Sequence, residues 1–216
     1  MNATAENLAA PKRPHKHKRS ETFERHALVD RLFHWTMACC VLLLLATGVL
    51  PRMGLHFSWV TFHWIAGLTL TALVAYHVGR SLRSKKVSTI WFTRAELQAK
   101  QVGKYSVSQK LMHHGLGLVV LGSVCTGLVL LKKIRIPLLT RDPYVVSPGT
   151  WGWLHVLHDL AAMAAITLVM IHVYFALLPE NRMYLRALIN GRMSRADQRA
   201  RVAAILNNGK PPSKSS

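Results

Sequence analysis

The chain has 216 residues, of which half are hydrophobic, and it carries a formal net charge of +19 at pH 7. A soluble domain of this length rarely combines so much apolar composition with so much charge, unless the two are separated along the chain. They are separated here, which argues against a soluble globular protein and predicts one membrane domain with short basic tails.

Four apolar runs contain no Lys or Arg, and they cover residues 32–50, 60–78, 111–131 and 156–178. Each approaches the roughly 20 residues that a helix needs to cross a bilayer. Because a bilayer requires every backbone polar group to be paired within the protein, runs of this length predict helices. We therefore expect an all-α, integral membrane four-helix bundle over residues 31–178. A basic cytoplasmic tail of residues 1–30 precedes it, and a cytoplasmic tail of residues 179–216 with a disordered end follows it.

Basic residues are distributed unevenly around these runs. Residues 1–31 hold seven Lys and Arg, residues 79–104 hold seven, and the tail from residue 179 holds eight, whereas the other two connections hold one and four. The positive-inside rule therefore predicts that both termini lie in the cytoplasm. The basic segment before the first run is explained by topology and by contact with anionic membrane lipid, so we expect no nucleic acid partner.

Histidine occurs in every apolar run, where ionisable residues are costly and indicate function. His63 and His77 are 14 residues apart, as are His158 and His172. Fourteen helical residues rise about 21 Å and end about 40° short of four full turns. The two histidines of each run therefore face nearly the same way at opposite depths, an arrangement that suits two haem groups with paired axial imidazoles.

Depth predicts which histidines meet, because alternate helices run in opposite directions. His63 and His158 both lie toward the outer face and are expected to bind the outer haem. His172 lies toward the cytoplasm, where either His34 or His77 can complete the inner haem. Depth alone leaves those two alternatives open. Ligation by two histidines leaves no open position on the iron, which indicates electron transfer instead of oxygen chemistry.

Several motifs resemble one family of membrane cytochromes. Arg31-Leu32-Phe33-His34-Trp35, residues 105–112, His158 with His172-Val173-Tyr174, and residues 187–194 resemble segments of the bacterial di-haem cytochrome b561 and formate dehydrogenase gamma-subunit superfamily. The likeness covers about residues 25–200. It implies a four-helix subunit of the bacterial inner membrane with two b haems, His34 and His172 on the inner one and His63 and His158 on the outer one.

The same resemblance implies a quinone site near the inner haem, at the start of the third helix. The candidates on the quinone side are Tyr105, Gln109, Lys110 and His113. His77 departs from the expected pattern and is kept as an alternative inner ligand. His113-His114 also departs from it, because aromatic residues are expected there.

The function expected from these features is electron transfer between the membrane quinone pool and a periplasm-facing dehydrogenase or reductase with an iron–sulfur subunit. The direction of flow is left open, and the chain is read as a subunit of an oxidoreductase because it has no nucleophile–base constellation. One alternative is a stand-alone cytochrome b561 that oxidises a small reductant such as superoxide and reduces quinone. Another is a histidine-lined metal transporter, since histidine also binds zinc and copper.

Overall fold

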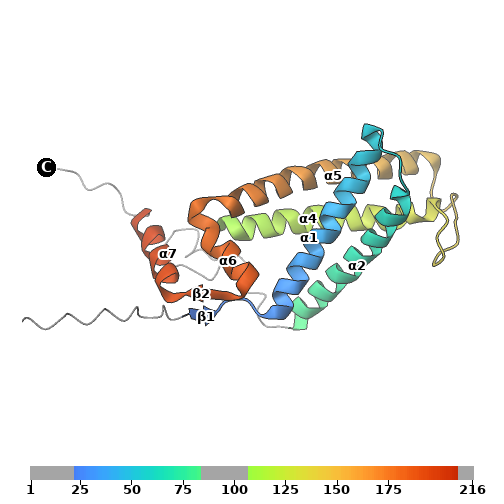
Figure 1. Ribbon diagram of the computed structural model, residues 1–216. Helices are drawn as coiled ribbons and strands as arrows, with labels where there is room; N and C mark the ends of the chain where they lie inside the picture. Colours follow the sequence, from blue (N-terminus) through green and yellow to red (C-terminus); the bar gives the residue numbers. More distant parts are fainter. Residues whose placement is uncertain (1–21, 84–106, 209–216) are drawn as a thin grey trace, which may run out of the picture.

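A computed structural model of the protein describes residues 22–83 and 107–208. Four long helices dominate it: α1 (Leu28–Val49), α2 (Trp59–Arg83), α4 (Val107–Leu130) and α5 (Pro148–Leu177). In Figure 1, α4 and α5 run along the length of the molecule, and α1 and α2 are inclined to them. The predicted all-α four-helix membrane bundle is confirmed.

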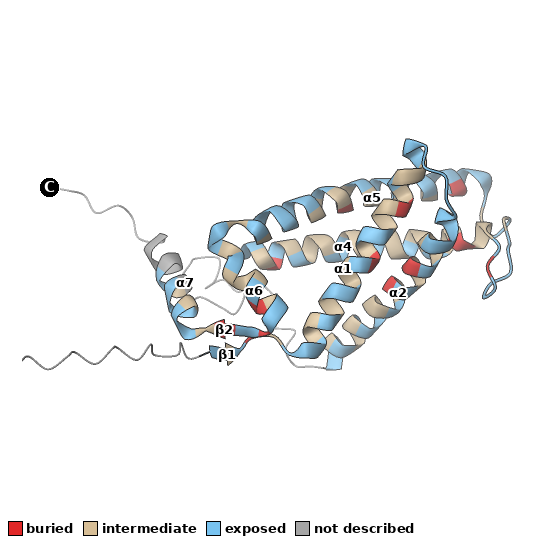
Figure 2. Ribbon diagram, in the orientation of Figure 1, coloured by how far each residue is buried: buried red, intermediate tan, exposed pale blue. Residues whose placement is uncertain are grey.

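All four helices are long and apolar enough to cross a membrane. In the most apolar window of each, no more than 11% of the residues are buried inside the protein. Figure 2 shows the consequence, since buried positions are sparse along all four helices. Apolar side chains that the protein does not cover need another apolar environment, so the chain is a multi-pass membrane protein.

The helices pack mainly as two antiparallel hairpins. The most extensive contacts join α1 with α2 and α4 with α5, while α2–α4 and α1–α5 contacts are few (Figure 1). The connection between α1 and α2 runs through η1 (Leu50–Met53), and the longer connection between α4 and α5 begins with η3 (Leu131–Lys133). We call the end with these two connections the loop end, and the opposite end the tail end.

Local sequence signals set the helix boundaries at the loop end. The Ser147 side chain accepts a hydrogen bond from the Thr150 backbone N–H, and Pro148 occupies the first turn of α5. Ser at the cap followed by Pro is a strong helix start. The helix therefore begins eight residues before the apolar run at residue 156, and its first two turns contain Trp151 and Trp153. Such aromatic residues favour the membrane–water interface.

A small structure closes the tail end. Strand β1 (Thr22–Glu24) pairs antiparallel with β2 (Arg192–Ser194), which connects α6 (Arg182–Asn190) to α7 (Arg195–Asn208). A short η4 (Pro179–Asn181) links α5 to α6. The segment before α1 is thereby hydrogen-bonded to the segment after α6.

Arg31 strengthens this closure from within α1. Its Nε donates to the Leu188 carbonyl at 3.0 Å, and its Nη2 donates to the Ile189 carbonyl. These carbonyls belong to the last turn of α6, where helical C=O groups lack partners within the helix. The start of α1 and the end of α6 therefore stabilise each other.

Candidate functional site

At the tail end, a histidine of the first span faces a histidine of the last. His34 of α1 and His172 of α5 have ring centres 6.4 Å apart, with an angle of 43° between the rings. The Nδ1 of His34 is buried and has no hydrogen-bond partner among the described residues. An unpaired buried polar atom is costly, so this ring is suited to a bound group.

At the loop end, the second span supplies the partner of α5. His63 of α2 and His158 of α5 have ring centres 6.2 Å apart, at an angle of 72°. The 14-residue step along α5 thus separates two histidine pairs at opposite ends of the bundle. Each pair joins one hairpin to the other.

The separations suit a metal held between two imidazoles. With about 2 Å for each metal–nitrogen bond and about 1.1 Å from that nitrogen to the centre of its ring, two axial imidazoles place their ring centres about 6 Å apart. Both pairs have this separation. The angle between the rings would be no obstacle, because an imidazole could rotate about a bond to a metal.

Threonine hydroxyls contact both histidines of the loop-end pair. The Thr47 Oγ1 lies 2.8 Å from Nδ1 of His63, and the Thr126 Oγ1 lies 2.8 Å from Nδ1 of His158. Thr47 is almost completely buried. A partner on one ring nitrogen orients the imidazole and directs the other nitrogen toward a ligand. Sequence reasoning missed both threonines, because each lies on a different helix from the histidine it contacts.

Gly127, beside Thr126, leaves room for the loop-end pair. A Cβ at this position would lie 3.3 Å from Cε1 of His158. The absence of a side chain therefore lets the imidazole lie directly against α4. Sequence reasoning missed this glycine as well, because its relation to His158 depends on how α4 and α5 pack.

His77 does not contact His172 and instead faces another helix. Its ring centre lies 6.0 Å from that of His113 of α4, and its ring stacks on Phe33 with centres 5.3 Å apart. Since the separation from His113 is close to that of the other two pairs, distance alone does not distinguish the three. The partner of each ring does distinguish them. His172 faces His34, whereas His77 faces His113 and belongs to a second cluster at the tail end.

Two other quinone-side candidates, Gln109 and Lys110, lie in the first turn of α4, next to this cluster. Lys110 is buried, with 3% of its surface exposed, and Gln109 is half-buried. His113 follows Lys110 by one turn and contacts His114 at 5.6 Å between ring centres. Tyr105 lies outside the described residues.

An ion pair stands near each histidine pair. At the loop end, Arg52 Nη2 lies 2.9 Å from a carboxylate oxygen of Asp159, next to His158. At the tail end, Arg80 Nη1 lies 2.6 Å from a carboxylate oxygen of Asp30, one turn before His34. Both pairs are partly exposed, so they contribute little to stability by themselves. Each nevertheless places opposite charges near an imidazole pair.

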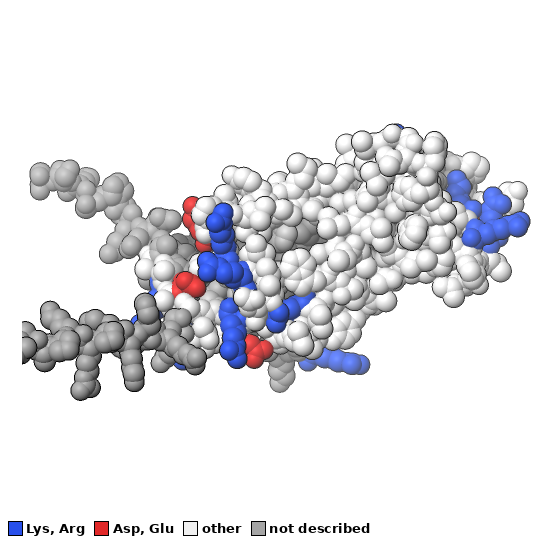
Figure 3. All heavy atoms as spheres, in the orientation of Figure 1, with Lys and Arg blue, Asp and Glu red and all other residues white. Residues whose placement is uncertain are grey.

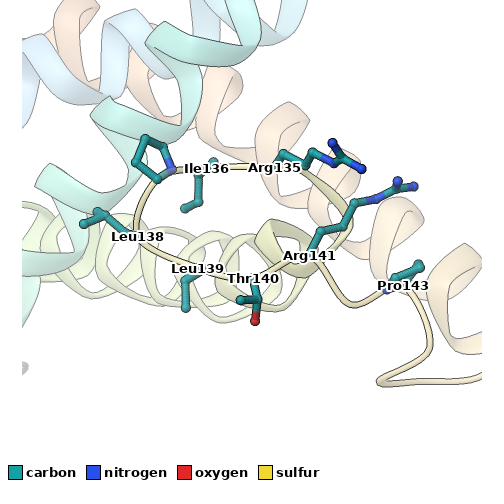
Figure 4. A pocket seen from close by; sticks show the side chains of 8 residues that line it. Arg135, Ile136, Leu138, Leu139, Thr140, Arg141 and Pro143 are labelled. Atoms are coloured by element: carbon teal, nitrogen blue, oxygen red, sulfur yellow. The ribbon is translucent and has the colours of Figure 1, made fainter.

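A shallow cavity occupies the connection between α4 and α5, away from the histidine pairs. It is lined by residues 135–141 and Pro143. Figure 4 shows Arg135 and Arg141 extending from the two arms of this loop toward the same side. The Nε of Arg141 donates to the Lys133 carbonyl at 3.0 Å, which ties the loop to the end of η3. The described residues include no cluster of three or more histidines, cysteines or carboxylates that could hold a metal ion.

The fold and the paired histidines define a class: a multi-span membrane protein with imidazoles arranged across its bundle. A family model described as prokaryotic cytochrome b561 matches residues 25–191, which include all four long helices. The chain belongs to this family. It is therefore a membrane b-type cytochrome, and family membership implies that it binds haem b and transfers electrons. A comparison with curated protein sequences gives no match.

Proposed function

We propose that this chain is a di-haem cytochrome b subunit that transfers electrons between a partner dehydrogenase or reductase and the membrane quinone pool. The observation that carries the proposal is the presence of two cross-bundle histidine pairs with ring centres 6.4 and 6.2 Å apart. When bound, haem iron supplies the one-electron chemistry. The chain supplies two imidazoles for each haem and an apolar surrounding.

The tail-end haem takes His34 and His172, and the loop-end haem takes His63 and His158. Contact between His34 and His172 supports His34 over His77 as the tail-end ligand. The stacking of His77 on Phe33 and its contact with His113 support a separate role for His77.

The loop end faces the outside of the bacterial inner membrane, and both termini lie in the cytoplasm. The excess of Lys and Arg in the tails and in residues 79–104 supports this orientation. In Figure 3, charged side chains gather toward the two ends of the molecule, with a largely uncharged region between them.

The partner docks at the loop end with an iron–sulfur subunit. Exposed groups suited to such a contact are Arg135, Arg141 and Tyr144, of which Tyr144 is 91% exposed. Arg and Tyr are enriched in protein–protein interfaces. These groups favour an acidic docking surface on the partner.

Quinone is reduced or oxidised at the tail end, beside the cluster of His77 and His113. An imidazole N–H can donate to a quinone carbonyl, and the ammonium group of buried Lys110 favours negative charge developing there. Gln109 adds an amide to the same turn of α4, and Tyr105 is proposed on its position in the chain alone.

Substitution at this cluster separates a quinone role from haem ligation. His77→Phe and His113→Gln should each leave two b haems per chain and slow electron exchange with a soluble quinone analogue at least tenfold. His155→Gln, at the opposite end of the bundle, is the matched control and should leave both quantities unchanged. Loss of one haem in His77→Phe would instead assign His77 as an axial ligand.

A stand-alone cytochrome b561 that oxidises superoxide and reduces quinone is the second candidate, favoured by the family description itself. It keeps the same two haems and needs no partner subunit. Gentle solubilisation followed by sizing distinguishes the two candidates. Co-purification with an iron–sulfur protein supports the subunit, whereas an isolated chain that reduces quinone with superoxide supports the alternative.

A further inference from the structure

Both histidines of the loop-end pair have a threonine at Nδ1. The two contacts have the same atoms and the same 2.8 Å length, although Thr47 is on α1 and Thr126 is on α4. The other threonines that bond back to their own helices, Thr36, Thr69, Thr71 and Thr167, make no such contact with a histidine. Ordinary back-bonding of threonine in an apolar helix therefore does not account for the pair.

The remaining bonds of these hydroxyls fix the direction of the contact. Thr47 Oγ1 donates to the Leu43 carbonyl at 2.7 Å, and Thr126 Oγ1 donates to the Gly122 carbonyl at 2.8 Å. A hydroxyl has a single proton, and a carbonyl can only accept. The oxygen of each threonine therefore accepts from an N–H at Nδ1 of its histidine.

This direction selects the tautomer that can bind iron. A neutral imidazole that carries its proton on Nδ1 has a lone pair on Nε2. A hydrogen bond accepted from Nδ1–H also raises the basicity of the ring as a metal ligand. Both loop-end imidazoles therefore carry their proton on Nδ1 and present Nε2 as the nitrogen that can bind iron.

The tail-end pair lacks this arrangement. The Nδ1 of His34 is buried without a hydrogen-bond partner among the described residues. The ring of His172, which faces His34, also makes no hydrogen bond with any described residue. The ion pairs do not cancel this difference in hydrogen bonding between the two histidine pairs, because each end has one Arg paired with one Asp. The two sites therefore differ in the hydrogen bonding of their imidazoles.

We propose that Thr47 and Thr126 are positioning residues that hold the loop-end imidazoles in the iron-binding tautomer and lower the reduction potential of the loop-end haem. The inference rests on the di-haem function proposed above. More basic axial ligands stabilise ferric over ferrous iron, so the loop-end haem has a lower potential than it would have without the two threonines. The resulting difference favours electron transfer toward the tail end.

Redox titration of the purified full-length holoprotein, followed by visible absorption, tests the proposal. Thr47→Val and Thr126→Val remove each hydroxyl while keeping the β-branched shape, and Thr47→Ser and Thr126→Ser retain the hydroxyl. The Val double variant should shift the electron-sharing equilibrium between the haems about tenfold toward the loop-end haem, or about 59 mV for a one-electron couple. The Ser variants should restore most of the original potential.

Thr36→Val on α1 and Thr167→Val on α5 are the matched controls, because each removes a hydroxyl that bonds only to its own helix. They should leave both potentials unchanged. The loop-end component of the titration is assigned by its loss in His158→Ala. Unchanged potentials in the Val double variant, or an equal shift of both haems, would overturn the proposal. Absence of two b-haem components in the unmodified protein would instead overturn the di-haem function.

Discussion

Individual side chains decide how closely the helices approach the loop-end site. Gly127 has no side chain between α4 and the imidazole of His158, and a Cβ there would lie 3.3 Å from Cε1. That distance is shorter than ordinary van der Waals contact, so the ring must move if the position is filled. The position of this imidazole thus depends on a residue of a neighbouring helix.

Gly127→Ala should perturb the proposed loop-end haem alone. The added methyl group pushes the imidazole away from α4, and overpacking of this kind costs about 1–3 kcal/mol. We expect a shifted or reduced b-haem absorption for one of the two haems, measured in the reduced-minus-oxidised spectrum. Gly122→Ala is the control on the same helix, because its Cβ would meet nothing within 4 Å. Equal spectra for Gly127→Ala and Gly122→Ala would contradict this account.

Spacing within a helix predicted the depth of each histidine, which was enough to identify one pair but not the other. Depth paired His63 with His158 and left His34 and His77 as alternatives for His172. The structure brings His34 to His172 and His77 to His113. The rotation of one helix about its axis relative to another depends on packing, and the periodicity of a single apolar run does not contain that information.

The helices and strands at the tail end are not predicted by the apolar runs. The sequence predicts a tail after residue 178, and the described part of this tail forms α6, β2 and α7. The pairing of β1 with β2 joins residues about 170 positions apart along the chain. Such short strands have no clear alternation of apolar and polar residues, so their partner is set by tertiary contact. The Ser-Pro start of α5, in contrast, is readable from local sequence.

Gly191 is the point at which α6 turns into β2, and its substitution should loosen the tail end. Its φ of +81° favours glycine, and a Cβ there would lie 3.0 Å from Arg31 Nη1 and 3.1 Å from the His26 carbonyl oxygen. Gly191→Ala should lower stability by about 1–3 kcal/mol, through backbone strain and crowding together. Thermal unfolding of the purified protein measures the effect.

Gly54→Ala is the matched control, since Gly54 has a φ of +89° but a Cβ there would meet nothing within 4 Å. It adds the strain without the crowding and should lower the melting temperature less than Gly191→Ala does. A larger loss in Gly54→Ala would refute the role assigned to the contacts of Gly191.

Composition and charge predicted the whole molecule more completely than they predicted the site. The separation of apolar and basic residues predicted four spans, and the same four segments form helices that are long and apolar enough to cross a membrane. Long apolar helices need little tertiary information, because their backbone bonds are satisfied within each helix. Predicting the loop-end site needs more tertiary information, because its residues come from all four helices.

The proposed orientation is testable on intact cells. In a variant whose three native cysteines are replaced by Ala, Thr140→Cys marks the loop end and Arg186→Cys marks the tail end; both positions are exposed. A membrane-impermeant maleimide should label Thr140→Cys in intact cells and Arg186→Cys only after the membrane is opened. The reverse pattern would show that the loop end faces the cytoplasm.

The haem content of paired histidine variants tests the central claim most directly. His63→Ala, His158→Ala and their double variant should each retain one haem per chain, because all three disrupt the same site. The double variant of His63→Ala with His172→Ala should retain none, because it disrupts both sites. Haem per chain, determined after extraction as the pyridine complex, should therefore depend on which pair is broken and not on how many histidines are removed. One remaining haem in the cross-pair double variant, or none in the same-pair double variant, would contradict the two cross-bundle pairs.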